Sequence, residues 1–117
     1  GKYFFEYNKI FKTPIIIAMI ETQEGLESIN EILQVKQLDG IFVGPYDLSA
    51  SLGIIGNFKA KKFMRSIKKI IFASKKNKKI LGIHVVQNSN KDLKQYISKG
   101  FKFIAYSMDS VILRFIK

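Results

Sequence analysis

The chain has 117 residues, of which 47% are hydrophobic and 25% charged, the proportions of an ordinary folded domain. It contains no cysteine, which excludes a disulfide framework and a thiolate metal site. Its longest apolar run, TPIIIAMIET, is shorter than the ~18 residues that a membrane-spanning helix requires. We therefore expect one domain, residues 1–117, with no membrane segment. Because no signal-peptide pattern opens the sequence, we also expect a cytoplasmic protein.

The basic charge of the chain raises the question of a nucleic-acid partner. Twenty Lys and Arg residues against nine Asp and Glu residues give a net charge of +11. Arginine, which readers of bases and phosphates favour for its planar fork, occurs only at Arg65 and Arg114. We interpret the lysines as a solvated surface in a chain of biased composition and predict no nucleic-acid partner. A basic α/β module that binds nucleic acid remains an alternative.

Strand-like and helix-like segments alternate four times along the chain. The apolar runs predict strands at residues 14–21, 40–44, 80–86 and 101–107. Helices are predicted at residues 3–11, 26–38, 58–79, 90–100 and 109–117.

Two of the predicted helices carry clear signals. The helix at 58–79 is amphipathic, and its apolar face is predicted to hold Phe63, Ile67, Ile70, Ile71 and Ser74. In the helix at 90–100, we expect Ser89 to cap the start, with Asp92 three residues on, and Gly100 to end it.

The order of these segments predicts an α/β fold. Continuous apolar runs are typical of strands buried on both faces, and a helix after each strand indicates parallel βαβ units with right-handed crossovers. Neither GxGxxG nor GxxxxGK[ST] is present, so no nucleotide-binding fold is indicated. An open doubly wound sheet and a piece of a (βα)8 barrel both remain open at this point.

Polar residues follow the predicted strands, at the edge where parallel α/β proteins place their chemistry. Glu21 ends the first strand, Asp47 follows the second, His84 lies near the end of the third and Asp109 follows the fourth. Converging carboxylates at Glu21 and Asp47 would suit a hard cation such as Mg²⁺ or Mn²⁺. The alternatives are a helix N-terminal acid at Glu21, a helix cap or Asx-turn at Asp47, and a packed, hydrogen-bonded histidine at His84.

Two stretches resemble a known family. The segment IETQEGLESINEILQVKQLDGIFVGPYDLSASLG closely resembles the HpcH/HpaI aldolases, metal-dependent pyruvate aldolases related to citrate lyase β subunits. The segment GFKFIAYSMDSVIL is similar to the last strand and following helix of that family. The resemblance implies a parallel (βα)4 half of a TIM (βα)8 barrel, in which the four strands match strands five to eight. The chain would then be the C-terminal half of such a barrel and a fragment of a longer protein.

The resemblance also implies a chemistry, the cleavage of a 4-hydroxy-2-keto acid to pyruvate and an aldehyde. Glu21 and Asp47 would bind Mg²⁺ or Mn²⁺, which stabilises the charge of the enolate as a Lewis acid. Backbone N–H groups of Gly44, Tyr46 and Asp47 would bind the carboxylate of the 2-keto acid, and no Schiff-base lysine is required. His84 would at most line the site.

The resemblance is incomplete, because a full barrel has ~250 residues. The family's catalytic histidine and substrate-binding arginine lie on the first half of the barrel and have no counterpart in this chain, so no catalytic residue is predicted here. We expect the chain alone to be inactive and to associate with a missing N-terminal half or with itself as a homo-oligomer. The alternatives are a non-catalytic fragment that keeps the metal site and a citryl-CoA-type lyase.

Overall fold

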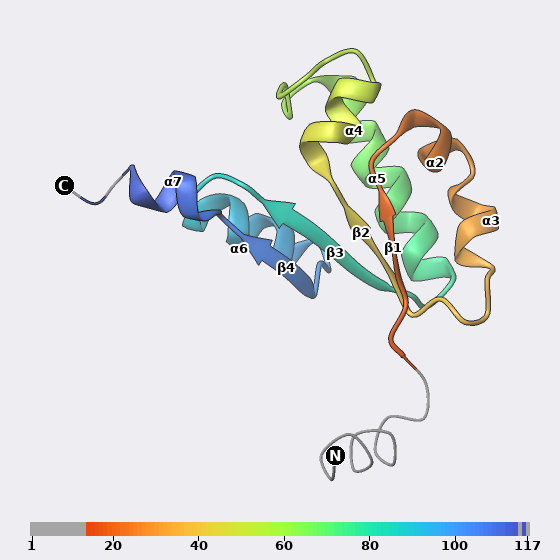
Figure 1. Cartoon of the computed structure of the whole chain (residues 1–117). Coiled ribbons are helices and arrows are strands. Elements are labelled where there is room, and N and C mark those ends of the chain that lie inside the picture. The colour runs from red at the N-terminus through yellow and green to blue at the C-terminus, as the bar shows by residue number, and fades with distance from the viewer. Residues whose placement is uncertain (1–13, 115, 117) are drawn as a thin grey trace, which may run out of the picture.

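The computed structural model describes residues 14–114 and residue 116, so the helix predicted at 3–11 lies outside the described residues. Four parallel strands form one sheet in chain order (Figure 1). The strands are β1 (Ile17–Ile20), β2 (Gly40–Val43), β3 (Ile80–Val85) and β4 (Phe103–Tyr106). The predicted α/β class with parallel strands is confirmed. The arrangement is consistent with half of a TIM-like barrel, whereas the match to strands five to eight stays a prediction.

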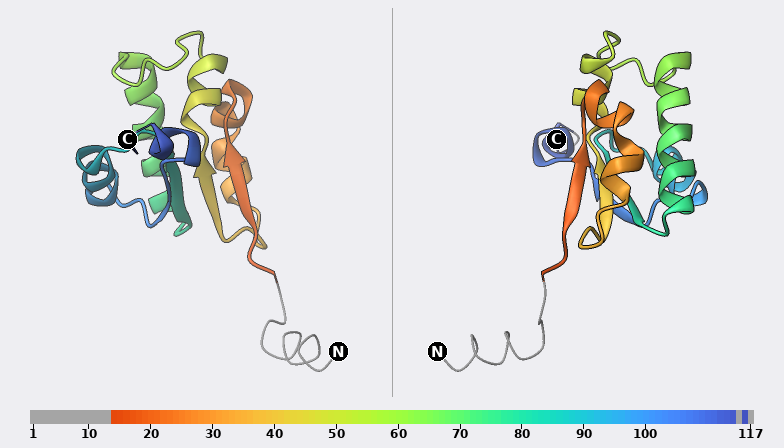
Figure 2. Two further views of the ribbon diagram at one scale, coloured as in Figure 1. Left: turned by 60° about the vertical axis from the view of Figure 1, so that its left-hand side comes forward. Right: turned by 90° about the vertical axis from the view of Figure 1, so that its right-hand side faces the viewer.

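The helices of the described residues lie between and after these strands. They are α2 (Gln23–Glu27), α3 (Ile29–Leu33), α4 (Pro45–Ser51), α5 (Lys61–Lys76), α6 (Asn90–Ser98) and α7 (Asp109–Leu113). Helices α3, α5 and α6 all lie on one side of the sheet (Figure 2). Within the described part of the chain, no helix is both long and apolar enough to cross a bilayer.

The hydrophobic core lies between the sheet and helix α5. The predicted apolar face of α5 is confirmed, since Phe63, Ile67, Ile70 and Ser74 are buried and Ile71 is half-buried. From the sheet, the core receives the helix-facing side chains Ile20, Ile41, Val43, Leu81, Ile83 and Val85. Burial of these apolar side chains between α5 and the sheet is the main contribution to the stability of the fold.

The other face of the sheet is uncovered, which corrects the prediction of strands buried on both faces. Met19, Phe42, Gly82 and Phe103 lie side by side in the register of the four strands, and Met19 and Phe103 are 56% and 54% exposed. The apolar runs were a misleading signal because four parallel strands do not close on themselves. In a closed barrel this face would be the packed interior.

Gly82 allows the two aromatic rings of the open face to meet. The Phe42 and Phe103 ring centroids lie 5.5 Å apart in an edge-to-face arrangement. A Cβ atom on Gly82 would lie 2.7 Å from the Phe103 carbonyl oxygen and 2.8 Å from Cδ2 of Phe42. Glycine is therefore required here for close packing of the neighbouring strands.

Two predicted segments differ from the structure. The helix expected at 26–38 is broken at Ser28 into α2 and α3 and ends at Leu33. Ser28 departs from helical geometry at this point (φ −87°, ψ 10°). The segment after β2, where no helix was predicted, forms helix α4. Its first residue is Pro45, whose fixed φ suits the start of a helix.

The ends of α5 and α6 share one geometry. Ser89 caps α6 by accepting a hydrogen bond from the Asp92 amide (3.2 Å), and Gly100 follows its end at φ 99°, as predicted. After α5, Lys78 takes the corresponding left-handed position at φ 54°. The Lys79 amide then donates to the Ser74 carbonyl (3.0 Å), which completes a Schellman motif.

We expect Lys78→Gly to raise the free energy of unfolding by about 0.5–1 kcal/mol, because a left-handed lysine is strained and glycine is not. Urea unfolding followed by circular dichroism measures the change. Lys76→Gly, two residues earlier within α5, is the matched control and should lower stability by about 1 kcal/mol. Equal destabilisation by both variants would contradict the assigned geometry.

Candidate functional site

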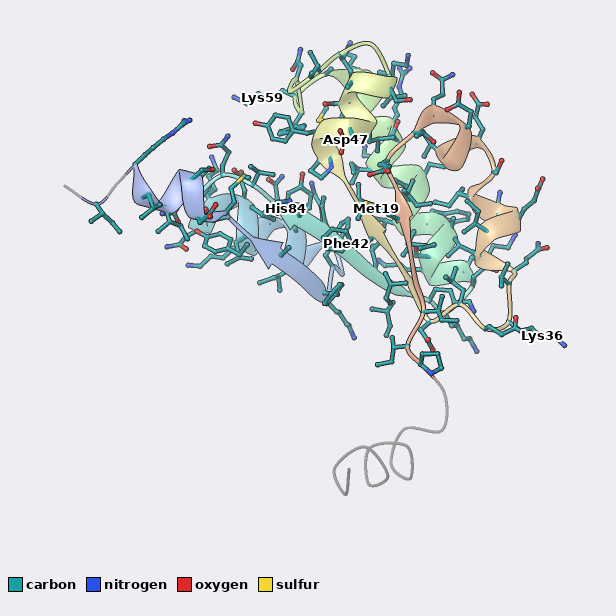
Figure 3. The ribbon with its side chains drawn as sticks, viewed as in Figure 1. Met19, Lys36, Phe42, Asp47, Lys59 and His84 are labelled. Carbon is teal, nitrogen blue, oxygen red and sulfur yellow. The ribbon has the colours of Figure 1, made fainter. Side chains whose placement is uncertain are left out.

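The register of the sheet brings the carboxyl ends of the strands to one edge. Ile20 pairs with Val43, Val43 with Ile83, and Ile83 with Ile104. β1 and β2 end in this row, and β3 and β4 continue two residues further, to the paired residues Val85 and Tyr106. Figure 3 shows the labelled Asp47 beyond this edge of β2 and His84 near the corresponding end of β3.

Glu21 follows β1 directly and is half-buried against the turn after β2. A Cβ atom built on Gly44 would lie 3.3 Å from the Glu21 Cβ and 3.5 Å from its Oε2. The Glu21 carboxylate thus lies beside the backbone that leads into α4. A larger residue at position 44 would displace the Glu21 side chain, so the glycine at this position allows Glu21 to lie where it does.

Asp47 is exposed in the first turn of α4. No side chain caps this helix, so the first-turn N–H groups of Tyr46 and Asp47 point out of the helix without a side-chain partner. The helix dipole favours a carboxylate at this end. Glu21 and Asp47 are therefore presented from two adjacent strands at the same edge.

Neither carboxylate is neutralised by the residues that the structure describes. Among these residues, Glu21 and Asp47 take part in no ion pair and no side-chain hydrogen bond. The same part of the chain holds no cluster of three or more His, Cys, Asp or Glu side chains. Two carboxylates fit a hard divalent cation that draws its remaining oxygen ligands from water or substrate.

The backbone amides of Gly44 and Tyr46 differ in whether they are free to donate a hydrogen bond to a ligand. The Gly44 amide already donates to the Ile20 carbonyl (3.1 Å) within the sheet. The Tyr46 ring packs edge-on against Phe58, with centroids 5.0 Å apart, and its hydroxyl accepts a hydrogen bond from Gln87 (3.3 Å). The Tyr46 side chain is thus held by its neighbours, which leaves its backbone amide as the group facing outward.

Two serines of α4 fix this helix in place. The Gln23 amide donates to Ser51 Oγ (2.8 Å), which ties the turn after β1 to α4. Ser49 Oγ donates to the Tyr46 carbonyl (2.7 Å) and accepts from the Gly56 amide (2.9 Å). The sequence analysis assigned no role to these two serines, because nothing in the sequence shows which backbone groups they meet.

His84 is hydrogen-bonded at the end of β4. Its Nε2 lies 2.9 Å from the Ser107 carbonyl oxygen, so Nε2–H is the donor and Nδ1 is the acceptor in the neutral ring. Ser107 has a left-handed φ of 58° and is only 5% exposed, and its hydroxyl has no partner among the described residues. Strain of this kind gathers at functional sites, and its presence here was not visible in the sequence.

A comparison with family models decides what kind of protein this is. The model described as HpcH/HpaI aldolase/citrate lyase matches residues 7–114. The chain belongs to this family. The recognition made from IET and GPYDLS is confirmed.

Relatives of the HpcH/HpaI chain carry aldolase names. A 5-keto-4-deoxy-D-glucarate aldolase of Klebsiella pneumoniae is 34% identical over 112 residues, which are 96% of this chain and 42% of that protein. A 4-hydroxy-2-oxo-heptane-1,7-dioate aldolase of Escherichia coli is 33% identical over 99 residues, 84% of this chain and 37% of that protein. The chain thus spans less than half the length of these relatives.

A solved structure shares the fold. The HpcH/HpaI aldolase of Desulfitobacterium hafniense superposes with a TM-score of 0.78 at 28% identity, over 86% of this chain and 38% of that one. The four-stranded parallel sheet with its helices therefore has a counterpart within a longer aldolase chain.

At the edge of this HpcH/HpaI sheet, we expect Ser107→Gly to raise the free energy of unfolding by about 1 kcal/mol. Glycine removes both the left-handed strain and the buried, unpaired hydroxyl, and the gain exceeds its greater loss of backbone entropy. Ser107→Ala removes the hydroxyl alone and should stabilise less. Urea unfolding of the two variants and the parent tests this order, and a Gly variant less stable than the Ala variant would contradict it.

Proposed function

We propose that this chain carries the metal-binding edge of a (βα)8 aldolase that cleaves a 4-hydroxy-2-keto acid to pyruvate and an aldehyde. The observation that carries the proposal is the position of Glu21 and Asp47, two carboxylates from adjacent strand ends, within a chain of the HpcH/HpaI family. The names of the two aldolase relatives support a keto acid as the substrate class.

Glu21 and Asp47 are the proposed protein ligands of a divalent cation, Mg²⁺ or Mn²⁺. Both side chains lack another partner among the described residues, and oxygen ligands are what these cations prefer. The cation supplies Lewis-acid stabilisation of the negative charge that develops when the carbon–carbon bond breaks. Gly44 leaves the room beside the backbone that the Glu21 carboxylate occupies.

The first turn of α4 is the proposed site for the substrate carboxylate. The outward amides of Tyr46 and Asp47 donate hydrogen bonds, and the positive end of the helix favours an anion. Gly44 belongs to this substrate-binding set because it has no side chain to crowd the site. Its amide is not available to the substrate, since it already donates to the Ile20 carbonyl. Ser49 and Ser51 hold the turn in position.

His84 lines the proposed site and is not assigned a proton-transfer role. Its Nε2–H is donated to the Ser107 carbonyl, which fixes the ring. By the family resemblance, the catalytic histidine and the substrate-binding arginine belong to the first half of the barrel. We therefore propose that the chain supplies the metal and carboxylate contacts and that turnover requires groups from another segment.

The open face of the sheet supports the proposal of a partner. Met19 and Phe103 are more than half exposed, although their row packs Phe42 against Phe103 as a core layer would. We propose that the N-terminal half of a barrel covers this face, either from a longer chain or as a separate one. A second copy of this chain is the alternative partner.

Two other functions remain less well supported. A citryl-CoA-type lyase would use the same fold and carboxylates, and the matching family description includes citrate lyase. A nucleic-acid-binding module receives no support from the names of the two relatives, which are both aldolases. We therefore favour the aldolase.

We expect Mn²⁺ binding to be lost in Glu21→Gln and in Asp47→Asn, because each change removes one of two carboxylate ligands. Mn²⁺ electron paramagnetic resonance of the 117-residue chain measures bound metal. Glu24→Gln, a nearby exposed acid in α2, is the matched control and should bind as the parent does. If both site variants retain parent affinity, the metal assignment is wrong.

Turnover is tested separately with 4-hydroxy-2-oxo-heptane-1,7-dioate and Mn²⁺, with pyruvate release followed by a coupled dehydrogenase. We expect this chain alone to release pyruvate no faster than Mn²⁺ without protein, because the general base is supplied from elsewhere. Glu21→Gln serves as the background control. Pyruvate release by the parent that Glu21→Gln abolishes would overturn the proposal that the chain is catalytically incomplete.

A further inference from the structure

A cleft of about 710 Å³ opens between helices α5 and α6 on the helix side of the sheet. This volume lies within the range of small-molecule sites, ~300–1,000 Å³. Met19 and Phe103 lie on the opposite, open face, so strands that complete a barrel on that face would not fill the cleft. The cleft reaches the edge where the strands end, since Pro45 and His84 belong to its lining.

The inner wall of the cleft is apolar. Phe63 and Ile67 of α5 and Val85 of β3 are buried at its base, and Phe58 packs on Phe63 with ring centroids 5.1 Å apart. Met64 continues this wall outward and is 48% exposed. An apolar group entering the cleft would therefore find a preformed aromatic and aliphatic surface, which favours its transfer from water.

The rim of the cleft is basic. The exposed lysines of the lining are Lys59, Lys68, Lys91 and Lys99, and Asp92 is the one acidic residue of the lining. The Asp92 amide is bonded to Ser89 at the start of α6, where the helix dipole favours the acid. The balance of charge around the opening thus favours an anion.

Tyr96 of α6 adds a neutral donor to this rim. Burial, with a smaller contribution from the charge of Asp92, raises the pKa of the Tyr96 hydroxyl above its ordinary value. The hydroxyl therefore stays protonated at neutral pH, and it has no hydrogen-bond partner among the described residues. Lys99 Nζ lies 5.5 Å from the centre of the Tyr96 ring, which places a cation beside this donor.

We propose that the cleft between α5 and α6 binds a small amphipathic anion, with its apolar body against Phe63, Ile67 and Met64 and its carboxylate or phosphate among the rim lysines and Tyr96. This site adjoins the edge that carries Glu21 and Asp47, because its lining includes Pro45 and His84, but neither carboxylate belongs to the lining. Apolar surface supplies affinity, and the lysines supply selection for the charged end.

Binding is tested on the ¹⁵N-labelled 117-residue chain by NMR titration with four probes. We expect 2-naphthyl phosphate and 2-naphthoate to bind at least about tenfold more tightly than uncharged 2-naphthol, and inorganic phosphate to show no saturable binding. The two charged probes distinguish a preference for phosphate from one for carboxylate. Equal affinity for 2-naphthol and its charged analogues would overturn the role of the lysines.

Charge-reversal variants locate the site. Lys68→Glu, on the cleft, should weaken binding of 2-naphthyl phosphate about tenfold, because it replaces an attraction with a repulsion. Lys69→Glu changes the net charge identically at the next residue of α5, outside the lining, and should leave the affinity within about twofold. Equal losses in the two variants would show diffuse attraction and overturn the site.

Two further variants test whether the probes bind in the cleft and not elsewhere on the molecule. Tyr96→Phe should weaken binding of the charged probes and leave that of 2-naphthol unchanged, because only the hydroxyl donor is removed. Glu21→Gln should leave all probe affinities unchanged. Probe-induced shifts confined to Met19 and Phe103 would place the probe on the open sheet face and overturn the proposal.

Discussion

The common register of four parallel strands is the constraint on which the rest of the structure depends. Because Ile20, Val43, Ile83 and Ile104 lie in one row, β1 and β2 end at the same level, β3 and β4 end two residues beyond it, and all the following turns lie at one edge. A slip of one residue in β1 would turn Glu21 to the other face of the sheet. The position of Glu21 and Asp47 after the ends of neighbouring strands therefore follows from the backbone hydrogen bonds that pair β1 with β2.

Only one face of the sheet is buried, so the face that would form a barrel interior remains exposed. Phe42 and Phe103 meet across Gly82 as neighbours in a core layer do, yet Phe103 remains largely exposed. Exposed aromatic surface of this kind is unfavourable in water and favours association. Glu21 lies on the same side of the sheet as Met19, since both approach the position of a Cβ atom on Gly44, so the open face extends to the edge that carries Glu21.

The sequence predicted the parts of the fold that local physics determines. The buried face of α5, the cap at Ser89 and the end of α6 at Gly100 follow from periodicity and from turn chemistry, and the structure agrees. Helix α4 was missed because its small polar residues are equally common in turns. The one-sided burial was missed because an apolar strand has the same sequence whether or not a facing layer is present. The positions of Glu21 and Asp47 at strand ends could be predicted, whereas the strain at Ser107 depends on tertiary contacts.

Strand β3 and the turn that follows it connect the two proposed sites. Val85 forms part of the base of the cleft, and the preceding residue, His84, also lines the cleft and reaches the end of β4. Gln87 lines the cleft and donates its side-chain hydrogen bond to Tyr46, in the first turn of α4. Asp47 is the next residue of that turn. A ligand in the cleft would therefore lie against Gln87, the residue whose side chain is hydrogen-bonded to Tyr46.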